Sequence, residues 1–355
     1  MSDAYGVAAG RGDLEGLARG VRRWAETAAD SPLYAFLARR VAADPELLAL
    51  VAQIPRTPPM NLLLGGVKLR LGEDDALAAW YPHLVGGDAR RPDDAAFVAF
   101  RDYVLAHADA LLEVGRTRRT QTNEASRAAA VLPWLAAAAE AWGEPVHLID
   151  IGASAGLNLC LDRFDYCYAT AEGTTELAAS DRGASQLTLA CELRDGIRPP
   201  RAVPSIASRT GLDLDPVDPT DPASAAWLEA LVWPEHEDRL ATLRAALEIR
   251  RETPVTMVAG DATHHLPHVL DGLPPGPVAI VHTVMAYQLS EAQRAELDAV
   301  CVAAERERPL VRIGMEPWSG SPYPRLTLGA SQREGTVVAS AHAHGRWLAR
   351  PERRP

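Results

Sequence analysis

The second half of the chain alternates between short apolar runs and helical patterns, and this alternation constrains the fold more than any other feature. The apolar runs begin at Val146, Ile206, Val255, Val278 and Leu310, and helical patterns lie between most of them. Strands that alternate with helices are typical of a mainly parallel sheet with helices on both faces. We therefore expect a doubly wound α/β domain over residues 121–355.

Three more runs have strand patterns and would extend this sheet. They cover residues 187–193, 325–328 and 336–348, and the last two would form a hairpin. Two segments, at about 163–205 and 216–236, disturb the alternation between strand and helix. We expect both to be insertions in the α/β domain.

Residues 1–120 carry helical patterns. Leu14, Leu17, Val21 and Trp24 recur at helical spacing, and another helical pattern spans residues 94–114. This predicts an N-terminal helical domain or cap in front of the sheet.

The charge and hydropathy of the chain exclude several classes of protein. The 355 residues include 36 basic and 47 acidic side chains, which give a net charge of −11. This excess of acid argues against a nucleic-acid-binding surface. No apolar stretch approaches the roughly 18 residues of a membrane span, and the first residues lack the layout of a signal peptide. We expect a cytoplasmic protein that binds neither nucleic acid nor membranes.

Neither the cysteines nor the clustered histidines have the spacing of a metal site. The four cysteines form no Cys-x-x-Cys pair, and Pro267 interrupts the histidine group at residues 264–268. Zinc sites usually combine such ligands at short, regular spacing. We expect reduced thiols and no bound metal.

The apolar run at Val146 leads directly into a glycine turn, Asp150-Ile-Gly-Ala-Ser-Ala-Gly-Leu-Asn158. Glycines allow the backbone to approach a ligand closely, and a helix starting after the turn would attract a negative group. The turn resembles the first motif of class I S-adenosylmethionine (SAM) methyltransferases, with Ser154 in place of the middle glycine. It also matches Gly-x-Ser-x-Gly, the nucleophile elbow of hydrolases. A tight connection without a ligand is the third interpretation.

Polar residues follow four of the expected strands at their carboxyl ends. They are Asp150, Asp213, Asp261 and His282. Ligands of doubly wound sheets bind at this edge, near the point where the strand order reverses. We expect one site there, in which Asp213 contacts ribose hydroxyls and Asp261 with Ala262 contacts the edge of an adenine.

The hydrolase interpretation is the weaker of the two functional ones. Asp261 and His282 follow Ser154 in the order that a catalytic triad of this type requires. However, an α/β-hydrolase places several strands before its nucleophile, whereas the residues before Val146 have helical patterns. A first sheet strand that carries the glycine turn agrees better with a methyltransferase.

A polar segment, residues 116–127, precedes an apolar helix expected over 128–142. Gln121, Asn123, Glu124 and Arg127 would line a cavity that faces the glycine turn. A solvated helix start explains the same residues equally well, so both interpretations remain open.

Several segments of the chain resemble the actinobacterial family known as domain of unknown function 2332 (DUF2332). They are Asn61–Leu64, Arg119–Glu124, Asp150–Leu159, Asp162–Arg163, Cys191–Arg194, Gly211–Asp218, Leu231–Glu235, Gly260–Ala262 and His344–Trp347. The resemblance covers most of the chain and implies a Rossmann-like fold similar to that of SAM-dependent methyltransferases. It implies no particular reaction. One departure is Gly65-Gly-Val-Lys68, where the family pattern reads Ala-Ala-Val-His.

We therefore expect a SAM-dependent transferase, a methyltransferase in the first instance, that acts on a small molecule. The residues expected to bind SAM are Asn123, Asp150, Gly152, Ser154, Gly156, Asn158, Asp213, Asp261 and Ala262. The candidates for orienting or deprotonating the acceptor are Glu124, His282, Tyr287 and Glu316.

Two alternatives share the fold but not the reaction. The first is a methyltransferase-like protein without methyl transfer, which serves as a partner subunit of a heteromeric biosynthetic enzyme. The second is an enzyme that carries out other SAM chemistry, such as cyclisation. The sequence leaves open a protein partner or a homodimer.

Overall fold

The computed structural model describes residues 13–121, 123–179, 187–319 and 321–351. The chain divides into two compact units, Met1–Thr122 with Asp221–Ala241, and Asn123–Thr220 with Thr242–Pro355. The first division falls near residue 120, where the helical patterns end. The segment expected as an insertion at 216–236 interrupts the chain of the second unit, and most of it belongs to the first unit.

The first unit is built from helices. They are α1 (Leu14–Thr27), α2 (Pro32–Val41), α3 (Pro45–Val51), α4 (Pro59–Arg70), α5 (Pro82–Val85), α6 (Asp94–Ala106), α7 (Ala108–Thr117) and α9 (Pro222–Ala230), with the 3₁₀ turns η2 (Ala76–Trp80) and η3 (Gly86–Asp88). Helix α10 (Glu237–Glu252) begins in this unit and ends in the second. The pattern expected as one helix over 94–114 is two helices, which meet at His107.

Capping side chains fix where several of these helices begin. Asp44 precedes α3 and accepts hydrogen bonds from the backbone N–H groups of Glu46 and Leu47, each at 3.0 Å. Pro45 occupies the first helical position, where its missing N–H has no partner to lose. The sequence Asp-Pro therefore starts this helix.

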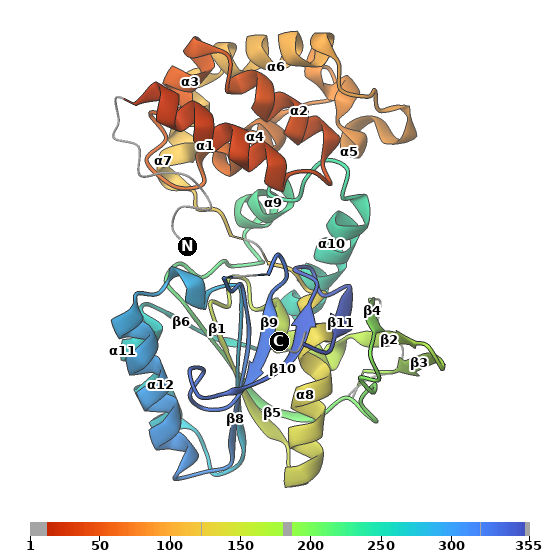
Figure 1. Cartoon of the computed structure of the whole chain (residues 1–355), viewed down its shortest axis with the longest axis vertical. Helices are drawn as coiled ribbons and strands as arrows, with labels where there is room; N and C mark the ends of the chain where they lie inside the picture. The colour runs from red at the N-terminus through yellow and green to blue at the C-terminus, as the bar shows by residue number, and fades with distance from the viewer. Residues whose placement is uncertain (1–12, 122, 180–186, 320, 352–355) are drawn as a thin grey trace. The chain divides into compact units, whose positions relative to one another are not determined.

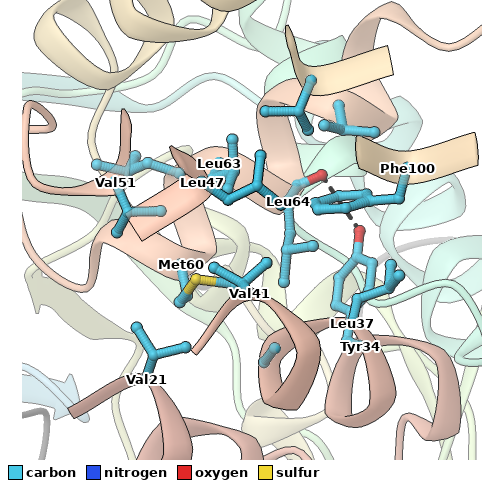
Figure 2. Packing of buried hydrophobic residues seen from close by; sticks show 14 of the residues in the cluster. Val21, Tyr34, Leu37, Val41, Leu47, Val51, Met60, Leu63, Leu64 and Phe100 are labelled. Atoms are coloured by element: carbon cyan, nitrogen blue, oxygen red, sulfur yellow. Dashed lines mark hydrogen bonds between the residues drawn. The ribbon is translucent and has the colours of Figure 1, made fainter. Parts of the chain in front are cut away.

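A single apolar core fills the first unit. Figure 2 shows part of it, with Leu37, Leu47, Leu63 and Phe100 fully buried. The hydroxyl of Tyr34 donates to the carbonyl of Leu64 inside this core, so the one polar atom of that ring is satisfied.

The residues Gly65–Lys68 of α4 pack against the segment around α9. A Cβ on Gly65 would lie 3.2 Å from the indole of Trp227, so glycine allows the close approach. The buried Lys68 side chain donates from Nζ to the carbonyls of Glu229 (3.1 Å) and Val232 (2.5 Å). These contacts of Gly65 and Lys68 hold Asp221–Ala241 in the first unit.

The second unit is built on an 11-stranded mixed sheet within the described residues. Its strands are β1 (Val146–Ile151), β2 (Asp165–Thr170), β3 (Gly173–Leu177), β4 (Thr188–Leu193), β5 (Ile206–Asp213), β6 (Thr256–Ala259), β7 (Val278–Thr283), β8 (Leu310–Glu316), β9 (Arg325–Leu328), β10 (Thr336–Ala341) and β11 (Trp347–Ala349). The spatial order is β3-β2-β4-β11-β10-β9-β8-β7-β1-β5-β6. The expected α/β class is thus confirmed, and β2 and β3 are additions that the sequence patterns did not predict.

The centre of the sheet is parallel. Strand β1 pairs with β5 on one side and with β7 on the other, and β6 and β8 continue the two halves. Along the chain, β5 and β6 are added on one side of β1, and β7 and β8 are then added on its other side. The order reverses between β1 and β7, which is where a doubly wound sheet forms a crevice.

Helices cover both faces of this parallel centre (Figure 1). Helix α8 (Arg127–Trp142) packs against β7 and β8 on one face, and α11 (Ala262–Gly272) and α12 (Glu291–Glu305) pack on the other. Ile149, Ile151 and Leu212 point into the α11/α12 layer and are fully or almost fully buried. The two faces thus have separate side-chain environments.

Pro133 in the middle of α8 leaves one backbone carbonyl of the helix without its usual N–H donor, and a side chain of β2 supplies another donor. A proline inside a helix cannot donate to the carbonyl four residues earlier, here that of Ala129. The buried hydroxyl of Tyr168 donates to that carbonyl at 2.9 Å. The interruption of one helix thereby orients a side chain of the sheet.

No helix among the described residues is both long and apolar enough to cross a membrane. All four cysteines are free thiols, and Cys167 is the only one that is not buried.

Candidate functional site at the carboxyl edge of the sheet

The glycine turn connects β1 to a short 3₁₀ helix, η4 (Leu157–Arg163). Gly152, Ser154 and Gly156 have φ angles of 75°, 50° and 78°. Ser154 is a non-glycine residue in the left-handed region, and such residues persist only where neighbours hold them. The expected helix start is thus a seven-residue 3₁₀ element, which lacks the aligned dipoles of a long α-helix.

Asp213, at the end of β5, holds the turn in place. Its Oδ2 accepts from the backbone N–H of Ser154 at 2.8 Å, and its Oδ1 accepts from that of Asp215, also at 2.8 Å. These hydrogen bonds stabilise the left-handed conformation of Ser154. Asp213 and the glycine turn, which are 59 residues apart, therefore form one structural element.

Asp150 lies directly below the turn and is 1% exposed. Burial raises the pKa of its carboxyl to about 8, and the charge of Asp213 adds to the effect. The amide of Asn158 donates to Oδ2 of Asp150 at 3.3 Å. Among the described residues, no hydrogen-bond partner meets Oδ1 of Asp150 or Oδ1 of Asn158. The site therefore holds a largely protonated acid at pH 7 and two unsatisfied oxygens.

A chain of polar contacts leads from Asn158 towards α8. The Asn158 amide lies 3.5 Å from the hydroxyl of Thr283, the last residue of β7. Arg127, which is 4% exposed, donates from Nη1 to the carbonyl of Thr283 (3.4 Å) and from Nε to that of Ala343 (3.0 Å). Arg127 thus connects the end of β7 to the turn between β10 and β11.

Glu124 and His344 meet at the end of this chain. Oε2 of the buried Glu124 lies 3.1 Å from Nδ1 of His344, at ion-pair distance but without the alignment of a hydrogen bond. Gly345 fixes the turn that carries His344, because a Cβ there would lie 2.1 Å from the carbonyl oxygen of Ser126. The nearby Asn123 has a buried amide nitrogen that meets no hydrogen-bond partner in the described part of the chain.

His282 belongs to a separate buried network. Its Nδ1 lies 2.7 Å from Oε1 of Glu316, and its Nε2 accepts from Nε of Arg312 at 3.1 Å. Burial and the Arg312 charge lower the pKa of His282, so the ring is neutral and Nδ1–H donates to Glu316. Arg312 also donates to Asp298 of α12 at 2.7 Å. Both ring nitrogens are engaged within the protein.

The two networks lie on opposite faces of the sheet. Successive residues of a strand point to opposite faces. Asp150 is opposite Val281 and Ile151 is opposite His282 in the register of β1 and β7. Asp150 therefore points to the α8 face, and His282 points to the α11/α12 face. The structure brings Asp150, Asn158 and Asp213 together, and it does not place His282 with them.

Asp261 is also directed towards the α11/α12 face, where it caps α11. It accepts from the backbone N–H and hydroxyl of Thr263 and, at 3.0 Å, from the amide of Gln293 in α12. These hydrogen bonds lower the pKa of Asp261. Ala262 is the first residue of α11 and is buried. The acid and the histidine of the hydrolase interpretation thus contact other partners, and no Ser-His-Asp array forms with Ser154.

Met285, which sequence reasoning missed, covers the first glycine of the turn. A Cβ on Gly152 would lie 2.5 Å from Cγ of Met285. The segment that carries it turns at Val284, which has a φ of 55°. The backbone N–H of Met285 lies 3.1 Å from both carboxylate oxygens of Glu316. The position of Met285 just after β7, at the switch point of the sheet, is the one sequence signal that could have indicated a role for this residue.

Tyr287 and Arg250 are the remaining side chains near this edge. Tyr287, in the 3₁₀ turn η5 (Ala286–Gln288), is 39% exposed. Arg250, also missed, is buried and donates from Nε to the carbonyl of Ala155 inside the glycine turn at 2.9 Å. No sequence pattern indicated it, because it lies on α10, nearly 100 residues from the turn in the chain.

The described residues contain no group of three or more His, Cys, Asp or Glu side chains that could hold a metal ion. A cavity of about 960 Å³ lies in the second unit at the other end of the sheet, beside Pro145 and Ser205, which precede β1 and β5. The carboxyl edge and this cavity are therefore separate places on the same sheet.

A sequence model of the family described as "Uncharacterized protein conserved in bacteria (DUF2332)" matches residues 18–350. The chain belongs to the DUF2332 family. The match includes both units, the glycine turn and the His344 turn, and it confirms the family that the motifs indicated. No curated protein matches the chain. Membership in DUF2332 assigns no reaction, so a function must be argued from the site.

Proposed function

We propose that this DUF2332 protein is a SAM-dependent transferase that acts on a small molecule, with methyl transfer as its reaction. The observation that carries the proposal is the strand order. Numbered along the chain, the parallel strands β6-β5-β1-β7-β8 read 3-2-1-4-5, the order found in dinucleotide-binding sheets. The glycine turn follows the first strand at the switch point, where such sheets bind their ligands.

The unsatisfied oxygens beside the turn support a cationic group of the ligand. Oδ1 of Asn158 is a buried acceptor for the ammonium group of the methionine part of SAM, and Oδ1 of Asp150 would become a second acceptor on losing its proton, which a cationic ligand favours. Gly152, Ser154 and Gly156 would bring the backbone close to that part of the cofactor. Asn123 would add an amide donor from the segment before α8.

The end of β5 would hold the nucleoside. The Asp213 carboxylate has lone pairs beyond the two that accept from the backbone, so it can also accept from ribose hydroxyls. Leu214, which follows it and is 68% exposed, offers an apolar surface to a purine ring. Asp261 and Ala262 stay as candidates for the adenine edge, because they follow the neighbouring strand β6.

Glu124 is the best supported candidate for deprotonating the acceptor. Methyl transfer needs mainly an aligned nucleophile, so one base near the acceptor is enough. Glu124 and His344 pair at the end of the contact chain that begins at Asp150. His282 and Glu316 are less suitable, because both ring nitrogens of His282 are engaged, one by Arg312 and the other by Glu316. Tyr287 is exposed and could orient an acceptor from the rim.

A second candidate function is a methyltransferase-like protein without methyl transfer, acting as a partner subunit or in other SAM chemistry such as cyclisation. Specific observations favour its first form, a partner subunit that does not bind SAM. Met285 covers Gly152, and both oxygens of Asp213 already accept backbone hydrogen bonds. A SAM molecule would therefore have to displace the Met285 side chain.

Isothermal titration calorimetry with SAM and S-adenosylhomocysteine on cofactor-free protein tests the proposal. We expect micromolar binding to the wild type, at least tenfold weaker binding to Asp213→Asn, and unchanged binding to Asp215→Asn, a matched change at an exposed acid. Met285→Ala should bind at least as tightly as the wild type, because it opens the space over Gly152. If neither the wild type nor Met285→Ala binds either ligand, the proposal is wrong.

A further inference from the structure

The cavity at the amino ends of the strands is independent of the site proposed for SAM. Its volume of about 960 Å³ is at the upper end of the range for small-molecule sites. It lies between the C-terminal half of α8 (yellow in Figure 1) and residues 196–205, with Val338 and Arg350 from the last strands of the chain. All of these residues belong to the second unit.

The walls of this cavity are apolar and stiff. Its main apolar residues are Pro133, Trp134, Ile197, Pro199, Pro200 and Pro204. Because the ring of proline fixes φ, a segment with three prolines in six residues has few alternative conformations. A stiff wall loses little entropy when a ligand binds, and flat rings pack well against proline and tryptophan.

The charges at the cavity favour an anion. Arg198, Arg201 and Arg350 line it, and Arg201 pairs with Glu140 at 2.8 Å. Neither Arg198 nor Arg350 forms an ion pair with another described side chain, and the other carboxylates near them are Glu144, which lines the cavity, and Asp195, which contacts the backbone of Arg350. The backbone N–H of Arg350 donates to Asp195 at 3.1 Å, which holds the base of that side chain in place. The lining thus carries three arginines against the two carboxylates of Glu140 and Glu144, a net positive charge that favours an anionic ligand.

Trp134 contributes an aromatic ring to the wall of the cavity. Its indole nitrogen is buried, so the ring carbons are the part of this side chain that a ligand can contact.

We propose that this cavity binds an aromatic carboxylate. The ring lies between Trp134 and the proline wall, and the carboxylate accepts from Arg198 and Arg350. The proposal does not depend on SAM binding, because none of the residues proposed to hold SAM lines the cavity.

Calorimetric titration of the full chain with 2-naphthoate tests this assignment, with neutral 2-naphthamide as the matched ligand. We expect 2-naphthoate to bind with one-to-one stoichiometry and at least tenfold more tightly than 2-naphthamide. The double variant Arg198→Ala/Arg350→Ala should weaken 2-naphthoate at least tenfold. Arg346→Ala, at an exposed arginine outside the cavity, should change nothing.

Two further variants separate the cavity from other surfaces. Ala137→Trp, at an exposed position of α8 that lines the cavity, should abolish binding by filling it. Asp213→Asn should leave 2-naphthoate binding unchanged. The assignment is overturned if the wild type does not bind 2-naphthoate, if both ligands bind equally, or if Ala137→Trp binds as the wild type does.

Discussion

Replacing the buried acid Asp150 by its amide is expected to change how the stability of the protein depends on pH. The pKa of Asp150 is about 8 in the folded protein and about 3.9 in an unfolded chain. Between these values the unfolded chain releases the proton and the folded protein keeps it. The unfolding free energy therefore falls by about 1.4 kcal/mol per pH unit. The contribution is fully present below pH ~3.9, and about 4 kcal/mol of it is lost by pH 7.

Asp150→Asn removes this titration and keeps the shape of the side chain. The amide oxygen can still accept from the amide of Asn158. We expect the stability of Asp150→Asn relative to the wild type to increase by about 1.4 kcal/mol per pH unit between pH 5 and 8, and then to level off. Urea unfolding at pH 5, 6, 7 and 8, followed by circular dichroism and tryptophan fluorescence, measures this difference.

Asp261→Asn provides the control for this experiment. Hydrogen bonds lower the pKa of Asp261, so this acid is ionised in both states over the whole range. Its stability relative to the wild type should therefore stay constant from pH 5 to 8. An equal difference for Asp150→Asn at all four pH values would show that burial does not raise the pKa of Asp150.

Two more predictions concern buried hydrogen bonds of the sheet unit. Tyr168→Phe should lower the unfolding free energy by about 1–2 kcal/mol, because the Ala129 carbonyl loses its donor. In a Pro133→Ala background a helical N–H replaces that donor, so a urea double-mutant cycle should show a smaller cost for the same change. Arg312→Met should cost about 3–5 kcal/mol in urea unfolding at pH 7, because it leaves the charge of Asp298 buried and unpaired. A cost below 1 kcal/mol would contradict this.

The sequence predicted the parallel centre of the sheet because each of its strands is a compact apolar run bounded by polar residues. Strands β7 and β8 closely follow their runs. Strand β3 was missed because it is polar and mostly exposed, with no apolar pattern. Strand β2 was missed although its buried Tyr166 and Tyr168 alternate with more exposed residues. No local pattern indicated where the segment Asp221–Ala241 packs, because contacts with α4, more than 100 residues away, hold it in the first unit.

The candidate site was predicted in part for a similar reason. Strand ends are visible in the sequence, so Asp150, Asp213, Asp261 and His282 were correctly placed at one edge of the sheet. The face to which each side chain points depends on the register between strands, and no local pattern encodes it. Whether a carboxylate accepts from the backbone also depends on the folded loop, as Asp213 and Asp261 both show.

The first unit is assembled from two pieces of chain, and this has a consequence during synthesis on the ribosome. Roughly 100 residues separate Thr122 from Asp221, and at about 5–20 residues per second they take roughly 5–20 s to translate. During that interval the surface of α4 around Gly65, which later packs against Trp227, is exposed. A chaperone that recognises nascent helices would find its target there, and a ribosome that pauses within β1–β5 would prolong the exposure.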